Sequence, residues 1–174
     1  MNKLRFKLAK LLLNFFKSKN NHLSTVHSSF ISDSHRILII DSEFETDKTI
    51  LNSLLTEFIV NGKELTLLLA ANKFNSIHQS SSIKLITYSP LDKTFFNFPK
   101  TYLLEDVTER EFDIVIDLNK EENLFALFIL KKVKSKYRLG YAKKNADKFY
   151  NFQIMDEIKS ENSDKNLLNC LKMF

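Results

Sequence analysis

Hydrophobic positions along the chain form short unbroken runs and longer stretches with helical spacing. Apolar runs of about six residues with few polar interruptions predict strands that are buried on both faces. Such strands are expected at residues 36–41, 65–70, 83–88, 112–118, 137–142 and 149–154. Several of them are separated by stretches in which apolar residues recur every three or four positions, which predicts helices.

Two of the predicted helices have clear ends. The first has Thr46 or Asp47 as its N-cap and stops at Asn61-Gly62. The second, over residues 124–136, gathers Lys residues near its C-terminal end, as the helix dipole favours. Strands that alternate with helices predict an α/β fold, a Rossmann-like and mostly parallel sheet with helices on both faces.

The remaining segments give shorter patterns. A helical piece is expected near residues 72–78, and a last helix from about Ser163. Residues 91–111 are expected to be irregular, apart from one helical turn at residues 103–108. The single cysteine, Cys170, is expected to be an apolar residue of the last helix rather than a reactive thiol.

The first twenty residues predict an amphipathic helix ahead of this domain. At roughly 100° per residue, apolar side chains fill one wide arc and basic side chains fill most of the remainder, with only Arg5 on the apolar side. The candidate contact residues for a membrane or a partner are Lys3, Arg5, Lys7, Lys10, Lys17, Lys19, Phe6, Phe15 and Phe16. The predicted organisation is a basic helix at 1–20, a Ser- and Asn-rich linker at 21–35 and a single domain at 36–174.

Charge distinguishes this helix from the rest of the chain. Of 26 Lys and Arg residues, six lie in the first twenty positions, which contain none of the 21 Asp and Glu residues, so the remainder is close to neutral. A broad apolar face beside a basic face suits an anionic membrane surface. The same helix is compatible with packing on its own domain or on a partner, because burying a Leu or Phe contributes roughly 1.5–3 kcal/mol in either place.

Several function classes are disfavoured. No apolar run reaches the roughly 20 residues of a membrane span, and LLLNFF lacks the cleavage site of a signal peptide, so a cytoplasmic protein is expected, with a position at the inner face of the membrane as one possibility. Dispersed histidines and one cysteine predict no metal site and no disulfide framework. The turn after the first strand, DSEFETDKT, has four acidic residues that oppose a phosphate, so no nucleotide cofactor is expected.

Three stretches read together suggest a family. RILIIDSEFETDKTILNSLLTEF, LTLLLA and FDIVIDLNKEENLFALFILKKVKSKYRLGY, within residues 36–142, resemble the N-terminal, acceptor-side half of family 9 glycosyltransferases of the lipopolysaccharide heptosyltransferase type. The resemblance places Asp47 on that family's proposed general base and Arg138 and Gly140 on a later strand. Glu43 and Thr46 stand where the family has glycines, and no donor-binding half is recognisable. A structural role as a helix cap is the favoured explanation of Asp47.

These observations lead to three expectations about function. The first is a non-catalytic binding or assembly module, held by its basic helix on an anionic membrane surface or a larger complex. The second is a degenerate acceptor-binding subunit in cell-envelope sugar transfer, with Asp47 as its catalytic residue. The third is an RNA- or ribosome-associated protein that uses the basic arm. The chain is also similar to short proteins of Bacteroidetes-type bacteria with a basic helix before such a domain, a likeness that implies no activity.

Overall fold

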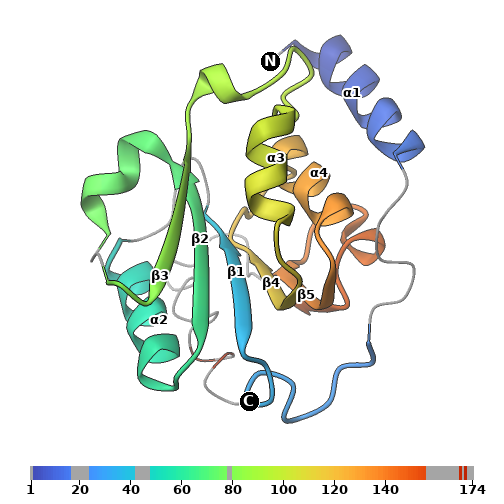
Figure 1. Cartoon of the computed structure of the whole chain (residues 1–174). Helices are drawn as coiled ribbons and strands as arrows, with labels where there is room; N and C mark the ends of the chain where they lie inside the picture. The colour runs from blue at the N-terminus through green and yellow to red at the C-terminus, as the bar shows by residue number, and fades with distance from the viewer. Residues whose placement is uncertain are drawn as a thin grey trace.

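The expected apolar runs pair into one parallel sheet (Figure 1). The computed structural model describes residues 2–16, 24–41, 48–77, 80–155, 169 and 171. Its strands are β1 (Arg36–Ile40), β2 (Glu64–Ala70), β3 (Ile83–Tyr88), β4 (Phe112–Asp117), β5 (Ser135–Tyr141) and β6 (Phe152–Ile154). Their order is β3-β2-β1-β4-β5-β6, and every neighbouring pair is parallel. The predicted Rossmann-like α/β fold is therefore confirmed.

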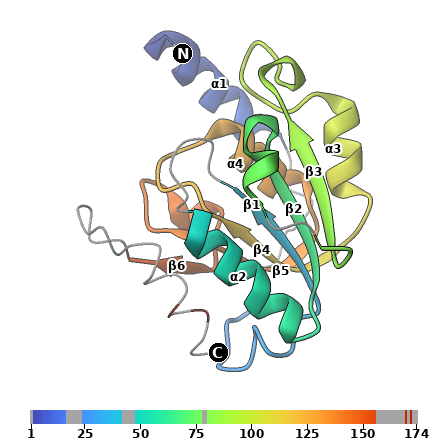
Figure 2. The same ribbon diagram turned by 90° about the vertical axis from the view of Figure 1, so that its left-hand side faces the viewer.

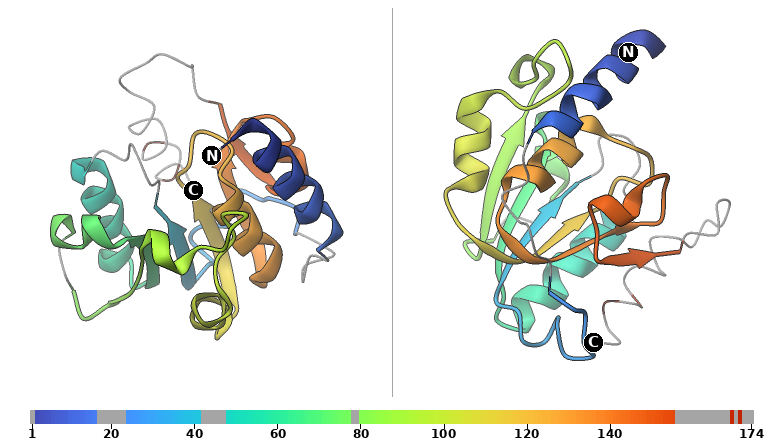
Figure 3. Two further views of the ribbon diagram at one scale, coloured as in Figure 1. Left: turned by 90° about the horizontal axis from the view of Figure 1, so that it is seen from above. Right: turned by 90° about the vertical axis from the view of Figure 1, so that its right-hand side faces the viewer.

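Helices cover both faces of this sheet. They are α1 (Lys3–Phe15), α2 (Lys48–Val60), α3 (Thr101–Thr108) and α4 (Leu124–Lys132), with short 3₁₀ helices η1 (Ala71–Ser76), η2 (Pro90–Asp92) and η3 (Ala146–Lys148). Figure 3 shows α2 on one side of the sheet, and α4 with α1 on the other. Helix α3 packs beside α4, and α1 forms an outer layer on α4. The predicted N-terminal helix is thus present and lies against the domain.

Successive side chains of a central strand enter two different cores, because they point to opposite faces of the sheet. In β1, Ile37 and Ile39 lie in the core beneath α2, whereas Leu38 and Ile40 lie in the core beneath α4. All four side chains are completely buried. Burial on both faces explains why this strand appears in the sequence as an unbroken apolar run.

The sheet order reverses between β1 and β4. The chain leaves β1 through α2 on one face and leaves β4 through α4 on the other face. In open α/β sheets, ligands usually bind outside the carboxyl ends of two such strands. There, the backbone N–H of Leu118 donates to the Ile40 carbonyl at 3.0 Å, which joins the two strand ends.

Helix α4 is shorter than predicted. It ends at Lys132, whereas the sequence pattern predicts a helix over residues 124–136. The last residues of that range belong to the sheet instead, because β5 begins at Ser135, which pairs with Phe112 of β4. Strand pairing therefore outweighs the helical preference of the Lys-rich end of this segment.

Other boundaries also differ from the sequence pattern. The segment at 91–111 contains the eight-residue helix α3, which is longer than the single turn expected and buries Leu103 and Val107. The last strand begins at Phe152 rather than residue 149, because η3 and a turn precede it. Outside the described residues lie the predicted N-cap at Thr46 or Asp47, the start of the helix expected from Ser163, and Cys170.

Part of the predicted linker packs on the domain. Phe30 is completely buried in the core beneath α2, and Ile31 is nearly so. The Phe30 ring lies 5.1 Å from that of Tyr137 and 5.5 Å from that of Phe152. An isolated apolar pair in a Ser- and His-rich stretch carries no periodicity, so the sequence pattern did not reveal this contact.

Candidate functional site

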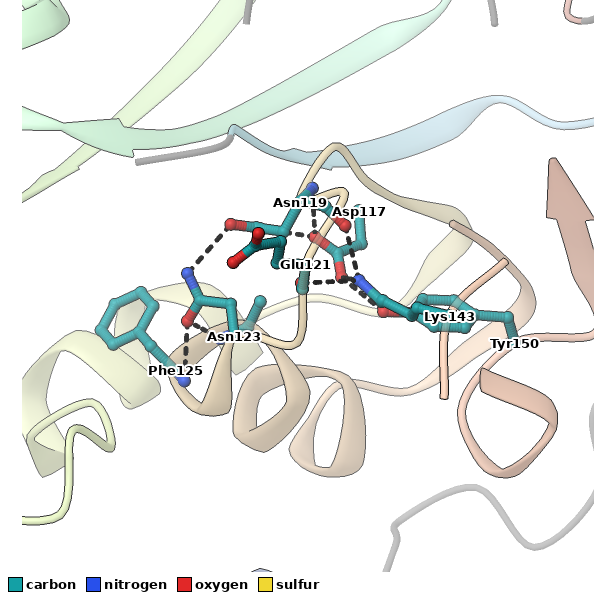
Figure 4. A network of polar contacts seen from close by, with 8 residues as sticks. Asp117, Asn119, Glu121, Asn123, Phe125, Lys143 and Tyr150 are labelled. Carbon is teal, nitrogen blue, oxygen red and sulfur yellow. Dashed lines mark hydrogen bonds and ion pairs between the residues drawn. The ribbon is translucent and has the colours of Figure 1, made fainter. Parts of the chain in front are cut away.

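Polar side chains gather around Asp117, at the carboxyl end of β4 (Figure 4). This residue is only 1% exposed, and its Oδ1 accepts hydrogen bonds from the backbone N–H of Asn119 at 3.0 Å and from Asn119 Nδ2 at 2.6 Å. Its Oδ2 accepts from Lys143 Nζ at 3.1 Å and from the Tyr150 hydroxyl. Each carboxylate oxygen therefore has two donors, which fills its capacity as an acceptor.

Lys143 connects this carboxylate to the loop that precedes α4. Its ammonium also donates to the carbonyls of Asn119 at 2.6 Å and Glu121 at 3.3 Å. Asn123 donates to Asn119 Oδ1 at 2.9 Å, and its own Oδ1 accepts from the backbone N–H of Phe125 at 3.0 Å, which caps α4. The network thus fixes the start of α4 relative to β4, a structural task.

Gly140 and Tyr150 complete the network. Gly140 pairs with Asp117 across β4 and β5, and a Cβ at this position would lie 2.5 Å from a carbon of the Tyr150 ring. Only glycine lets the ring lie against the strand. Burial, followed by the nearby charge of Asp117 and their hydrogen bond, raises the pKa of the Tyr150 phenol well above its usual value. The hydroxyl therefore stays protonated and remains a donor.

Arg138, in the middle of β5, has a structural role. Its guanidinium is buried, with Nε donating to Ser135 Oγ at 3.1 Å and Nη2 donating to the Val133 carbonyl at 3.0 Å. Burial lowers the pKa of this guanidinium to about 10. Arg138 and Gly140, which the glycosyltransferase resemblance singled out, thus both support the interior of the domain.

A second buried carboxylate, Asp41, follows β1 at the same edge of the sheet. Its Oδ2 accepts from Lys73 Nζ at 3.0 Å, whereas its Oδ1 has no hydrogen-bond partner among the described residues. Asp41 is therefore less completely bonded than Asp117. The described part of the chain places no group of three or more His, Cys, Asp or Glu side chains so that they could hold a metal ion.

The inner side of α1 packs on the domain. Ala9 and Leu13 are buried in the core beneath α4, and Phe6 and Leu12 are partly buried against it. Lys131 of α4 donates to the carbonyls of Leu13 at 2.8 Å and Phe16 at 3.0 Å, at the end of α1. The inner side of this helix therefore packs on its own domain, which was one of the two alternatives.

The outer side of α1 carries an exposed stripe of apolar residues. It consists of Leu4, Leu8, Leu11 and Phe15, which are 66%, 50%, 58% and 78% exposed. Their spacing of four, three and four residues places them on one side of the helix. Lys3 and Lys7 are exposed one turn apart along the edge of this stripe, and α1 contains no acidic residue. Figure 2 shows α1 at the top of the molecule.

The structure separates the contact residues predicted on α1 into two groups. Lys3, Lys7 and Phe15 lie on the exposed side. The others contact the domain: Phe6 packs on the core, Lys10 pairs with Glu122 at 2.6 Å, Phe16 lies edge-on to Phe128 at 4.9 Å, and Arg5 stacks on Phe95 at 3.9 Å. Lys17, Lys19 and the catalytic candidate Asp47 lie outside the described residues.

Leu4, Leu8 and Leu11 belong to the apolar arc in the sequence, but they are not among the contact residues that the sequence predicts. The signal that could have found them is the width of that arc. A helix that packs on one neighbour needs only a narrow stripe, so a broader arc indicates that a second apolar surface remains.

Comparison with known proteins gives a family and no activity. Residues 5–174 match DUF6913, a family of unknown function, and the chain belongs to this family. No curated protein and no solved structure matched. None of the helices in the described part of the chain combines the length and the apolar character that a membrane span requires.

Proposed function

We propose that this protein is a binding module that attaches to an anionic membrane surface through α1. The exposed stripe is the observation that carries the proposal. Soluble proteins rarely leave a continuous row of large apolar side chains in water unless it contacts a partner or a membrane. Lys3 and Lys7 lie beside the row, where they would meet lipid phosphates, and no acidic side chain of α1 opposes them.

The free energies involved favour a reversible attachment. Full burial of a Leu or Phe side chain contributes roughly 1.5–3 kcal/mol, and a Lys near an anionic leaflet contributes about 1 kcal/mol. Four partly exposed apolar side chains and two lysines are therefore comparable to a myristoyl chain, which binds with a constant of roughly 10⁴ M⁻¹. The inner side of α1 stays on the domain, so the domain would be carried to the membrane in a defined orientation.

The network around Asp117 has a structural rather than a catalytic role. Asp117 has both oxygens fully bonded and holds α4 in place, so it has no free acceptor for a reacting group. In this proposal the sheet domain is a rigid carrier, and attachment to the membrane is the function of α1.

The test is co-sedimentation with lipid vesicles. The full chain should bind vesicles that contain phosphatidylglycerol and should bind pure phosphatidylcholine vesicles more weakly. The double substitution Leu8→Ser/Leu11→Ser removes two exposed apolar side chains, which corresponds to a loss on the order of a hundredfold in the partition coefficient. Thermal unfolding of the double variant should match that of the parent, because both side chains are exposed.

The matched control is Val60→Ser. Val60 is also strongly exposed, but it lies at the end of α2, on the opposite face of the sheet from α1. Its replacement should leave vesicle binding unchanged. The proposal fails if the parent does not bind anionic vesicles or if Leu8→Ser/Leu11→Ser binds them equally well. A solution dimer that the double variant loses, without vesicle binding, would make the exposed stripe a contact between two copies.

A further inference from the structure

A second exposed apolar group lies on the segment between β3 and α3. Residues 94–97 form a tight turn in which the Asn97 N–H donates to the Thr94 carbonyl at 2.9 Å. The Thr94 N–H donates to the Phe98 carbonyl at 2.8 Å, and the Phe98 N–H donates to Thr94 Oγ1 at 3.1 Å. Asn97 adopts the left-handed conformation that closes such turns, with φ of 63°. The turn is therefore well defined by its own hydrogen bonds.

This turn presents one phenylalanine to solvent. Phe98 is buried in the core beneath α4 and Phe96 is partly buried against it, whereas Phe95 at the tip is 69% exposed. The rings of Phe95 and Phe96 meet edge-on at 5.3 Å, so the exposed ring rests on an anchored neighbour. A large apolar side chain at the tip of an ordered turn loses little conformational entropy on insertion into another phase.

Arg5 joins this turn to α1. Its guanidinium carbon lies 3.9 Å from the centre of the Phe95 ring, so the two segments are neighbours although they are far apart in the chain. No carboxylate among the described residues pairs with Arg5, and its Nε, which is buried, has no hydrogen-bond partner there. A guanidinium that is stacked on an aromatic ring and has no counter-charge is suited to a phosphate group.

We propose that Phe95 is a second membrane-inserting residue and that Arg5 beside it binds the phosphate of an anionic phospholipid headgroup. This inference rests on the proposed membrane attachment of α1. The occupant follows from charge complementarity, because Lys3, Arg5 and Lys7 supply positive charge around the exposed apolar side chains. The nearest carboxylate of the same segment, Asp92, is engaged by Ser89 and by the Tyr102 hydroxyl.

Two points of contact have a geometric effect that one helix lacks. A helix that lies in the interface can rotate about its own axis, whereas a helix and a turn together define a plane. Because Phe95 belongs to the segment that follows β3, its insertion fixes the direction of the sheet relative to the membrane.

The test uses the fact that the chain contains no tryptophan. Single tryptophans are introduced as Phe95→Trp in the turn, Phe15→Trp on the exposed stripe and Phe74→Trp on η1, away from α1. With vesicles that contain phosphatidylglycerol and brominated acyl chains, the Phe95→Trp and Phe15→Trp emissions should shift to the blue and be quenched. The Phe74→Trp emission should not change.

The outcomes separate this inference from the proposed function. Insertion of Phe15→Trp without Phe95→Trp overturns the inference and leaves membrane attachment by α1 intact. If neither tryptophan inserts, both proposals are overturned. A blue shift of Phe95→Trp that occurs without lipid indicates a protein contact, which also overturns the inference.

The role of Arg5 has its own test. Arg5→Gln should weaken binding to anionic vesicles about fivefold, the effect expected for one basic side chain near the surface. Lys48→Gln, which removes the same charge at the start of α2, should have a smaller effect. Equal losses of vesicle binding for the two variants would show that Arg5 contributes only through the net charge of the protein. That result would overturn the proposed phosphate site. Matched thermal unfolding of both variants verifies that each is folded.

Discussion

Asp113, in β4, shows how a single carboxylate holds both neighbouring strands, β1 and β5, at the amino end of the sheet. Its Oδ2 accepts from the backbone N–H groups of His35 and Arg36, each at 2.9 Å, and its Oδ1 accepts from Lys136 Nζ at 2.8 Å. Burial raises the pKa of this carboxyl, but the donors from Arg36, Lys136 and His35 outweigh it and lower the pKa to about 2.

This pKa predicts a specific dependence of stability on pH. The pKa of Asp113 is about 2 in the folded protein, below its ordinary value of 3.8. The charged carboxylate therefore stabilises the fold at pH values above 3.8. The contribution is about 2 kcal/mol, and it is lost as the pH falls from about 4 through about 2. Urea unfolding over this pH range should show the loss in the parent chain and a smaller one in Asp113→Asn. An Asp106→Asn control, at an exposed position of α3, should behave as the parent.

Gly140→Ala should destabilise the protein through Tyr150. The added methyl group would meet the buried Tyr150 ring, and overpacking of this kind typically costs about 1–3 kcal/mol. The measurement is the free energy of unfolding in urea, as a double-mutant cycle with Tyr150→Leu. The cost of Gly140→Ala should shrink when the ring is absent. An equal cost in both backgrounds would show that the ring is not the cause.

At the residue scale, the sequence predicts where a polar residue lies in an element better than it predicts which side chains that residue contacts. The run at 112–118 has an acidic residue next to its last position, and this residue, Asp117, is the end of β4 in the structure. Its donors Lys143 and Tyr150 lie 26 and 33 residues further along the chain, and only the sheet order brings them together. Likewise, Arg5 looks like a misplaced charge in the helix until Phe95 is placed beside it.

At the element scale, the two sides of α1 differ in burial, which predicts different effects of mutation. Leu13→Ala, on the inner side, should lower the free energy of unfolding by about 2–5 kcal/mol, because it leaves a cavity in the core. Leu11→Ala, on the outer side, should stay within about 0.5 kcal/mol of the parent. Urea unfolding of the two variants measures the difference. Similar values would mean that α1 does not occupy this position in solution.

The sequence pattern predicted the existence of α1 but not which side would face the domain. Leu8 and Leu13 look equally apolar in the sequence, and only packing against α4 makes Leu13 the buried one. Packing also defines α3, whose Leu103 and Val107 cover the core from a segment that was expected to be mostly irregular. Local patterns therefore predicted helices well where apolar periodicity was long, and poorly where a short helix depends on its neighbours.

At the scale of the whole molecule, the alternation of strands and helices was sufficient to predict the fold. Unbroken apolar runs indicate strands covered on both faces, and such strands form parallel sheets joined by crossovers. The position of the reversal between β1 and β4 was not predictable, because it depends on which edge each crossover takes. The burial of Phe30, near the end of the predicted linker, was not predictable either, because its contacts form only in the assembled sheet.

Two hydrogen bonds from Lys131 hold the end of α1 from a distant part of the chain. Helix α1 has no basic residue in its own last turn, and its final carbonyls are satisfied by an amine that lies 118 and 115 positions away in sequence. The end of α1 is thus held by a residue of α4. Acetylation of that one lysine would remove its charge and weaken its hold on the end of α1, the proposed membrane contact, without changing any residue of α1 itself.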